Sequence, residues 1–236
     1  MRDIHSHIMY GIDDGSRSLE ESIKLLKIQE KKGITDIILT PHYIENTDYT
    51  CSIQRKNDII NELQKYTTIN LYTGNEVYIT ENIKELLEKE KISTLNNSRY
   101  LLLELPMNNK IVNVEDILYS LIRINIVPII AHPERYSYVQ DDIKYLNNLK
   151  EMGILFQGNY ESLFGKYGEK AKKSLRKLIK LNYITFLGSD MHRLDYEYHQ
   201  EKLEKKLLRI TKNKNMVEDL ISNNILKVIN NEEIDD

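Results

Sequence analysis

The chain has 236 residues, of which 29% are charged, and its formal net charge is only -3. This length can bury a sizeable core, and no linker or low-complexity tract divides it, so we expect one ordered domain over residues 1–236. The near-neutral charge gives no indication of nucleic-acid binding. The single cysteine excludes an internal disulfide, and no apolar run approaches the roughly 18 to 20 residues of a membrane span. Together these features favour a cytoplasmic protein without membrane insertion.

The first half of the chain alternates strand and helix patterns. After an opening strand, Ser18 and Glu21 form a capping-box pattern that predicts a helix start, and Gly33 stands where that helix should end. Further strands are expected at 35–40, 70–76 and 100–104, and further helices at 53–66, 81–89 and 114–124.

The second half continues the alternation, with strands expected at 127–132, 154–159 and 184–190 and helices at 141–152, 170–181 and 201–211. Strands of nearly continuous apolar character between helices indicate a parallel sheet that is covered on both faces. With about seven such units, the predicted fold class is α/β, a single-domain distorted (β/α)7-type barrel.

Most of these strands end in a side chain that can bind a metal ion. In His5-x-His7 the two imidazoles would point the same way from a strand. The other candidates, each after an apolar run, are His42, Glu76, Glu104, His132, Asp190 and His192. One histidine at a strand end is more often packed or hydrogen-bonded than a ligand, but here five of the six histidines take that position. Because barrels place their chemistry at the carboxyl ends of the strands, we expect a shared metal site there and a structural role for His199.

Six segments carry a resemblance to a known family. They are DIHSHI (3–8), DDGS (13–16), TPHY (40–43), GNEVY (74–78), HPERY (132–136) and GSDMH (188–192). In this order the sequence resembles the polymerase and histidinol phosphatase (PHP) family of metal-dependent phosphoesterases. Within that family it is most similar to the manganese-dependent protein-tyrosine phosphatases encoded with bacterial capsule and exopolysaccharide operons. The resemblance implies a PHP barrel that hydrolyses phosphotyrosine on the C-terminal tail of a bacterial tyrosine autokinase.

The resemblance also implies a site with three divalent metal ions. His5, His7, Glu76 and Asp190 would hold the first ion, a bridging Glu76 with Glu104 and His132 the second, and Asp14, His42 and His192 the third. Asp13 is the rival of Asp14, since either could instead form a turn with Gly15. Imidazole and carboxylate ligands suit Mn, Fe, Co or Zn, and the resemblance favours Mn²⁺.

Charge arithmetic makes a phosphate substrate reasonable. Four ligand carboxylates contribute about -4 and three divalent ions about +6, which leaves a positive site for a phosphomonoester dianion. Metal-activated water could then attack phosphorus. Arg135 is the predicted catalytic, phosphate-binding cation, because a guanidinium matches phosphate bidentately; the alternative is a surface ion pair with Glu134. Glu134 itself is expected either to orient His132 or Arg135 or to face solvent.

One segment departs from the family pattern. Relatives have a further arginine shortly after the Asp-x-His pair, whereas here Asp195 is followed by Tyr196 and Glu197. Arg193 is therefore the candidate for a second phosphate-binding cation.

The sequence also bears on three other functions. A cysteine-dependent phosphatase would need an arginine six positions after Cys51, where Asn57 stands, so that mechanism is excluded. A small-molecule phosphatase, acting for example on histidinol phosphate, and a catalytically weak regulator that binds the phosphorylated kinase tail both stay open. Residues 166–214 hold 14 Lys or Arg against 6 Asp or Glu, which is either solvated helix surface or a docking surface for an acidic partner.

Overall fold

The protein's structure is a computed structural model that describes residues 1–194 and 198–234. In this part of the chain the strands pair only in parallel. They are β1 (Arg2–Asp3), β2 (Asp36–Leu39), β3 (His42–Tyr43), β4 (Asn70–Thr73), β5 (Glu76–Tyr78), β6 (Tyr100–Glu104), β7 (Val127–Ala131), β8 (Leu155–Asn159) and β9 (Phe186–Gly188).

The strands form two sheets, one in the order β1-β2-β4 and one in the order β3-β5-β6-β7-β8-β9. The chain passes between the sheets at the short breaks after β2 and after β4. On the opposite side, the sheets are joined where His7 N–H donates to the Met191 carbonyl (2.8 Å) and Asp190 N–H donates to the His5 carbonyl (2.9 Å). If β2 with β3, and β4 with β5, are each taken as one interrupted strand, seven strands surround the centre. The predicted distorted barrel of seven units is confirmed.

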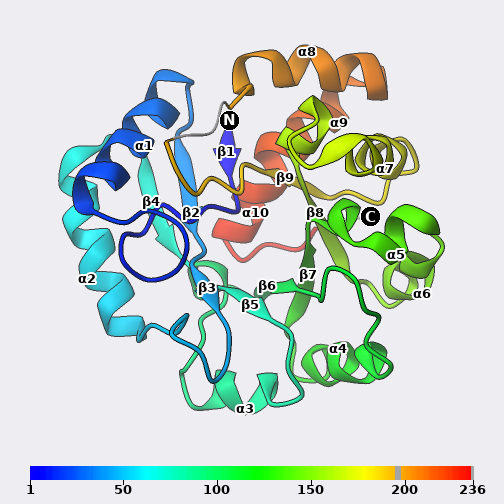
Figure 1. Ribbon diagram of the computed structural model, residues 1–236, viewed down its shortest axis with the longest axis horizontal. Helices are drawn as coiled ribbons and strands as arrows, with labels where there is room; N and C mark the ends of the chain where they lie inside the picture. The colour runs from blue at the N-terminus through cyan, green and yellow to red at the C-terminus, as the bar shows by residue number, and fades with distance from the viewer. Residues whose placement is uncertain (195–197, 235–236) are drawn as a thin grey trace.

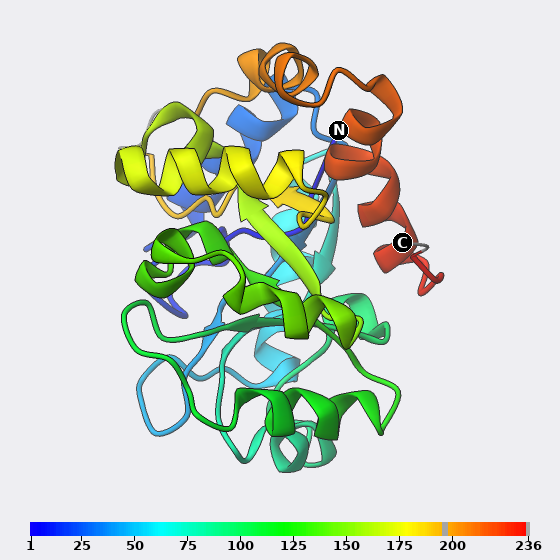
Figure 2. The same cartoon turned by 90° about the vertical axis from the view of Figure 1, so that its right-hand side faces the viewer.

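Helices connect the strands and cover the outside of the barrel (Figures 1 and 2). They are α1 (Leu19–Lys31), α2 (Ile53–Leu63), α3 (Ile83–Glu88), α4 (Val114–Ile122), α5 (Ser137–Asp141), α6 (Tyr145–Glu151), α7 (Gly168–Lys180), α8 (Gln200–Thr211), α9 (Lys214–Glu218) and α10 (Asn224–Ile229). Short helical turns lie at Gln64–Tyr66, Leu95–Asn97, Pro133–Arg135, Tyr160–Phe164 and, with π-helical bonding, Asp219–Asn223. Within the described residues, each helix is too short or too polar to cross a membrane.

Strand β2 shows why the strand sequences are apolar throughout. Ile37 and Leu39 belong to a cluster with the inward faces of α1 and α2, whereas Ile38 points the other way into a cluster with Ile4 and Leu102. Successive side chains of a strand alternate between faces, so a sheet with both faces covered needs apolar residues at every position.

The predicted caps of α1 are largely correct. Ser18 Oγ accepts a hydrogen bond from the Glu21 N–H (3.3 Å), but the Glu21 carboxylate binds the Arg17 N–H (2.9 Å) instead of completing the box with Ser18. Gly33 has φ of 78°, in the left-handed region that glycine adopts at low cost.

Three predicted elements are wrong in detail. The strand expected at 70–76 is divided into β4 and β5, and β2 similarly stops before β3, where Pro41 has no N–H for a ladder bond. The helix expected at 141–152 begins later than predicted, as α6, and the short helix α5 before it was not predicted. The helices that follow α8 were not predicted, although Ile225, Val228 and Ile229 pack into the core.

Candidate metal centre

A cavity of about 360 Å³ opens at the carboxyl ends of the strands. Most of the predicted metal-binding side chains line it, and so do both predicted arginines: Asp14, His42, Glu76, Glu104, His132, Arg135, Asp190, His192 and Arg193. The remaining two, His5 and His7, lie beneath the lining in contact with Glu76. The tertiary structure thus brings all nine predicted ligands to one place.

His5 and His7 follow β1, which ends at Asp3 and is therefore shorter than expected. Their Nε2 atoms are 3.1 Å apart, and they lie 3.1 and 3.2 Å from Oε2 of Glu76. Asp190 Oδ1 lies 3.5 Å and 3.4 Å from the same two nitrogens. These atoms face one another in the interior, so an ion placed among them would meet imidazole and carboxylate groups at once.

Glu76 stands at the centre of the site. Its Oε2 is 3.1 Å from His42 Nδ1, and its Oε1 is 2.9 Å from His132 Nε2. The His132 Nε2 atom is also 3.7 Å from Glu104 Oε1. Burial, together with the neighbouring Glu76 carboxylate, raises the pKa of Glu104 to about 8. Two carboxyl groups held this close together in the interior are well suited to a cation between them.

The backbone is strained where two of these side chains enter the cavity. His132, directly after β7, has φ of 34°, and Asp190, two residues after β9, has φ of 50°. Residues other than glycine rarely adopt such left-handed conformations, and they persist where the surrounding structure enforces them. The sharp turns leave both side chains directed towards the cavity.

The structure separates Asp13 from Asp14. Asp14 lines the cavity, with Oδ1 at 3.5 Å from His192 Nε2 and 3.8 Å from His42 Nε2. The Asp13 carboxylate instead binds His7 Nδ1 (2.7 Å) and accepts the N–H of His42 (2.8 Å) and Gly15 (2.9 Å). Asp14 is thus the member of the pair that faces the cavity, while Asp13 holds the ring of His7.

The residues present fit a set of metal ions. Three overlapping groups have ligand atoms that all lie within 4.8 Å of one another: His7 with Asp14, His42 and His192; His5 with His7 and Asp190; and His42 with Glu76 and Glu104. Glu76 Oε2 is buried and has no hydrogen bond within the described residues. The three imidazole nitrogens within 3.2 Å of this oxygen are not aligned to donate to it, and such an arrangement of donors around one oxygen fits ligands that share a cation.

Arg135 lies at the rim of the cavity and contacts Asp190. Its Nη1 donates to Asp190 Oδ2 (3.1 Å), and the guanidinium carbon is 4.4 Å from the centre of the Tyr167 ring. Since Arg135 pairs with Asp190 and Glu134 is fully buried, Arg135 does not form the surface ion pair with Glu134 that was the alternative. A cation stacked on an aromatic ring beside the cavity is held in a fixed orientation.

Arg193 also lines the cavity, next to His192. Its Nη1 is buried and has no hydrogen-bond partner among the residues that the structure describes. The neighbouring Asp195, Tyr196 and Glu197, where the family pattern departs, lie outside the described residues.

Of the positions predicted for Glu134, the one that faces solvent is wrong. Glu134 is fully buried, and its Oε1 accepts the N–H of Asn159 (3.0 Å) and the hydroxyl of Ser162 (2.6 Å). Burial raises its pKa to about 7. Its position beside β8 depends on the tertiary packing of the turn at Pro133–Arg135, which the sequence pattern does not reveal.

Sequence reasoning also missed several polar residues that support the site. Gln157 and Asn159 of β8 contact His5 and Asp190, and Tyr167 donates its hydroxyl to Asp190 Oδ2 (3.2 Å). Gln157 and Asn159 alternate with Phe156 and Gly158 in an otherwise apolar strand, and this pattern could have predicted that both amides face the site.

Lys56 is a further missed residue. It is fully buried in α2, and its Nζ donates to the Gly74 carbonyl (3.1 Å), to Asn75 Oδ1 and to Ser93 Oγ. Burial lowers its pKa to about 8. These contacts hold the break between β4 and β5, directly before Glu76.

Two residues lie apart from the cavity. His199 pairs with the buried carboxylate of Glu161 (2.9 Å), as its predicted structural role requires. Cys51 is 8% exposed and is not part of the cavity lining. Burial raises the pKa of its thiol, which disfavours the thiolate form that a nucleophile needs.

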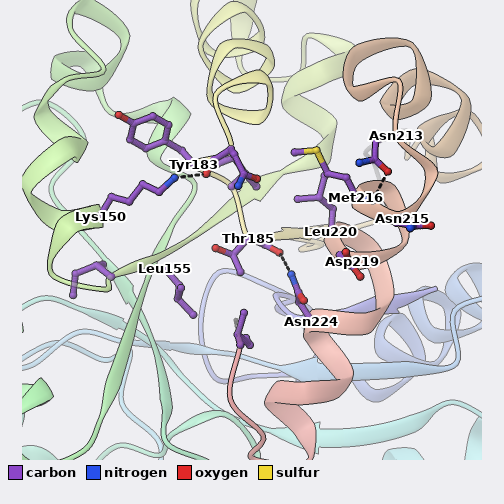
Figure 3. A pocket seen from close by; sticks show the side chains of 14 residues that line it. Lys150, Leu155, Tyr183, Thr185, Asn213, Asn215, Met216, Asp219, Leu220 and Asn224 are labelled. Carbon is purple, nitrogen blue, oxygen red and sulfur yellow. Dashed lines mark hydrogen bonds between the residues drawn. The ribbon is translucent and has the colours of Figure 1, made fainter. Parts of the chain in front are cut away.

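A second cavity, of about 490 Å³, lies at the amino ends of β8 and β9 (Figure 3). It is lined by apolar side chains and amides, and there Lys150 Nζ donates to the Asn182 carbonyl (2.6 Å) and Asn224 to the Thr185 carbonyl (3.0 Å). None of its described lining residues is a histidine, and Asp219 is its only carboxylate. Larger size alone does not make it a candidate for catalysis.

The fold and the cavity define a class of protein, an α/β barrel with a cluster of candidate metal ligands at the carboxyl ends of its strands. Solved structures with the same general fold include a dihydropyrimidinase from Brevibacillus agri, with a TM-score of 0.57 at 13% identity over 98% of this chain and 70% of the other. That likeness concerns the fold alone.

Closer relatives identify the family. The sequence model of a family described as capsular polysaccharide synthesis, CpsB/CapC, matches residues 1–230. CapC of Staphylococcus aureus is 37% identical over 81% of this chain and 77% of its own, and the tyrosine-protein phosphatase CpsB of Streptococcus pneumoniae is 33% identical over 83% and 84%. A solved structure described with YwqE from Bacillus subtilis and CpsB from S. pneumoniae as metal-dependent tyrosine phosphatases covers 100% of this chain and 96% of its own, with a TM-score of 0.92 and 28% identity. The chain belongs to the CpsB/CapC family.

Proposed function

We propose that the protein is a metal-dependent protein-tyrosine phosphatase that hydrolyses phosphotyrosine monoesters. The observation that carries the proposal is the meeting of five imidazoles and four carboxylates around one cavity with two arginines at its rim. Its relatives named CpsB and YwqE are tyrosine-protein phosphatases, which supports the same reaction here. We also propose that residues 1–236 act as one phosphoesterase domain in the cytoplasm.

The proposed cofactor is a set of three divalent ions, with Mn²⁺ preferred. His5, His7, Glu76 and Asp190 would hold one ion, Glu76 with Glu104 and His132 a second, and Asp14 with His42 and His192 a third. When bound, such ions supply positive charge and lower the pKa of water so that it can attack phosphorus. The nitrogen-rich donor set favours Mn²⁺ over Mg²⁺, because Mg²⁺ prefers oxygen ligands and keeps its waters.

The chain's own contribution is to bind and orient the phosphate. One N–H group of Arg135 is engaged with Asp190, and its other donors remain for the equatorial phosphate oxygens. The Tyr167 ring holds that guanidinium in place from the side. Arg193, whose buried Nη1 lacks a hydrogen-bond partner within the described residues, would serve as the second phosphate-binding cation.

The proposed partner is the phosphorylated, acidic tail of a bacterial tyrosine kinase that acts in polysaccharide export. A basic surface of Lys172, Arg176 and Lys206 between α7 and α8 supports this choice, with Glu169 paired to Lys172 (2.7 Å) as the acidic residue beside it. The Lys206 Nζ lies 4.2 Å from the centre of the Phe164 ring, and burial together with the charges of Lys172 and Arg176 lowers the pKa of this lysine. Lys166, which lines the cavity, lies near the rings of Tyr167 and Tyr198 and connects the surface with the site.

A single comparison tests the proposal. Purified protein loaded with Mn²⁺ is assayed on a phosphotyrosine peptide, a phosphoserine peptide and histidinol phosphate side by side, and the highest kcat/KM is expected for the phosphotyrosine peptide. Faster hydrolysis of histidinol phosphate would make the protein a small-molecule phosphatase. Tight binding of the phosphotyrosine peptide without turnover would make it a regulator.

A further inference from the structure

Strand β8 contributes none of the nine proposed metal ligands, yet two of its residues contact them. Gln157 and Asn159 are two positions apart, so they project from the same face of the strand, and both are fully buried. Gln157 Oε1 is 2.8 Å from His5 Nδ1, Gln157 Nε2 donates to Asn159 Oδ1 (3.0 Å), and Asn159 Nδ2 donates to Asp190 Oδ2 (2.6 Å). An unbroken series of hydrogen bonds therefore joins an imidazole to a carboxylate.

The carboxylate fixes the direction of this series. Asp190 Oδ2 also receives hydrogen bonds from Arg135 (3.1 Å) and Tyr167 (3.2 Å), so the Asp190 carboxyl is held ionised and can only accept. Asn159 must then turn its NH₂ group to Asp190 and its oxygen to Gln157. Gln157 must in turn direct its NH₂ group to Asn159 and its oxygen to the His5 ring.

The series ends by defining the tautomer of His5. An amide oxygen cannot donate, so the ring nitrogen facing it, Nδ1, must carry the proton. In the neutral ring, which is the form that binds a metal ion, the lone pair is then on Nε2, which lies 3.1 Å from Glu76 Oε2 and 3.5 Å from Asp190 Oδ1, towards the centre of the site. The hydrogen bond on one imidazole nitrogen decides which other nitrogen can bind a metal ion.

We infer that Gln157 and Asn159 are positioning residues that hold His5 with a free Nε2 lone pair and leave only Oδ1 of Asp190 directed at the cavity. The inference rests on the proposed metal site and adds to it a neutral amide relay for His5. His7 is held differently, because its Nδ1 binds the carboxylate of Asp13 (2.7 Å).

Gly188 of β9 provides the space for the relay. A Cβ atom at this position would lie 3.0 Å from Gln157 Nε2 and 2.9 Å from His5 Cβ, closer than packed atoms allow. Gly188→Ala should therefore displace His5 and the Gln157 amide together without removing any polar group.

The first test is the affinity for Mn²⁺ alone, measured by calorimetry on metal-stripped protein. Gln157→Leu keeps the approximate volume but removes both hydrogen bonds, and Mn²⁺ binding should weaken by about 10- to 100-fold, the usual effect of losing a group that orients a metal ligand. Gln200→Leu is the matched control: Gln200 is a glutamine of 5% exposure that donates to Gln29 outside the cavity. It should lose stability to a similar degree and keep the Mn²⁺ affinity of the parent.

Asn159→Asp tests the direction of the relay with almost no change of shape. It places a carboxylate oxygen where an NH₂ group faces Asp190, so Mn²⁺ binding should weaken at least as much as in Gln157→Leu. Because it removes no volume from the core, Asn159→Asp also tests the role of the amides if Gln157→Leu does not fold.

Nuclear magnetic resonance reads the tautomer directly. In the parent loaded with diamagnetic Zn²⁺ and labelled with ¹⁵N-histidine, His5 should keep its proton on Nδ1, and Gly188→Ala or Gln157→Leu should speed exchange of that proton with water. A His5 proton on Nε2, or parent-like Mn²⁺ affinity in Gln157→Leu, would overturn the role of the amides. A parent that binds no Mn²⁺ would instead overturn the proposed metal site, and this inference with it.

Discussion

Two cavities lie at opposite ends of the same strands, and they differ in chemistry more than in size. The carboxyl-end cavity, of about 360 Å³, gathers imidazoles, carboxylates and arginines. The amino-end cavity, of about 490 Å³, has four asparagines and apolar side chains around one lysine and one aspartate (Figure 3). Strands β8 and β9 serve both, with Leu155 and Thr185 at one end and Asn159 and Asp190 at the other. The convergence of ionisable groups, not volume, distinguishes the candidate site.

Metal removal should have the largest effect, and it concerns the carboxyl-end cavity alone. A chelator should reduce phosphatase activity to the background rate, and Mn²⁺ should restore it better than Mg²⁺ because the donors are rich in imidazole. The measurement is the initial rate on a phosphotyrosine peptide before and after dialysis against each metal. Full activity in protein shown by elemental analysis to be metal-free would contradict the proposal.

Removal of a single ligand should come next. His7→Ala and Asp190→Ala should each lower both the bound metal and kcat, the latter by more than about 100-fold, since the charge that stabilises the transition state is lost with the ion. Metal content by elemental analysis and steady-state kinetics check the result. Asn224→Ala in the amino-end cavity is the matched control and should leave the bound metal and kcat at the parent values. Equal losses of metal and kcat in Asn224→Ala would show that the carboxyl-end cavity is not the specific metal site.

Arg135 should matter for phosphate more than for metal. Arg135→Ala should lower kcat/KM on the order of 10²-fold, the usual cost of one donor to transition-state charge. Metal content should stay near that of the parent, because Asn159 and Tyr167 still hold Asp190 Oδ2. Arg123, exposed after α4, supplies the control Arg123→Ala. Parent-like kinetics in Arg135→Ala would remove that residue from the mechanism.

The basic surface of Lys172, Arg176 and Lys206 should have a smaller, substrate-specific effect. Reversal of charge at Arg176 and Lys206 should slow turnover of a multiply phosphorylated tail by several-fold at low salt and spare a small aryl phosphate, because only the tail would contact this surface. The difference should shrink at physiological salt, where exposed charges are screened beyond about 8 to 10 Å. Lys173→Glu is the control: Lys173 borders a separate hollow with Asp141 and Asp142. If turnover of the tail and of the aryl phosphate slowed equally, the basic surface would be ordinary solvated helix surface and not a docking site.

The smallest effect is expected at Cys51. Cys51→Ser should leave kcat/KM unchanged within about twofold, since the buried thiol lies outside the cavity and no thiolate attack is proposed. Loss of phosphatase activity in a variant with the thermal stability of the parent would revive a cysteine mechanism.

The strand-end histidines and carboxylates were predictable because their signal is local. An apolar run that ends in His132 or Glu104 places that side chain at the carboxyl end of a strand, and in a barrel of parallel strands those ends meet at one mouth. The helices and strands were predictable for the same reason. Their prediction is wrong where contacts with distant parts of the chain decide the local structure. The break before Glu76 depends on Lys56 from α2, and α9 and α10 are stabilised by packing against the core rather than by a strong helical pattern.

The sequence by itself determined the fold class, the nine residues that could bind metal and the phosphatase family that they resemble. Only the tertiary structure decided that Asp14 faces the cavity while Asp13 holds His7, that Glu134 is buried beside β8, and that Gln157 reaches His5. The physical reason is the separation along the chain of the residues that determine each feature. A strand end is defined by a few neighbouring residues, whereas the hydrogen bond that selects a tautomer joins residues 5 and 157, which only folding brings together.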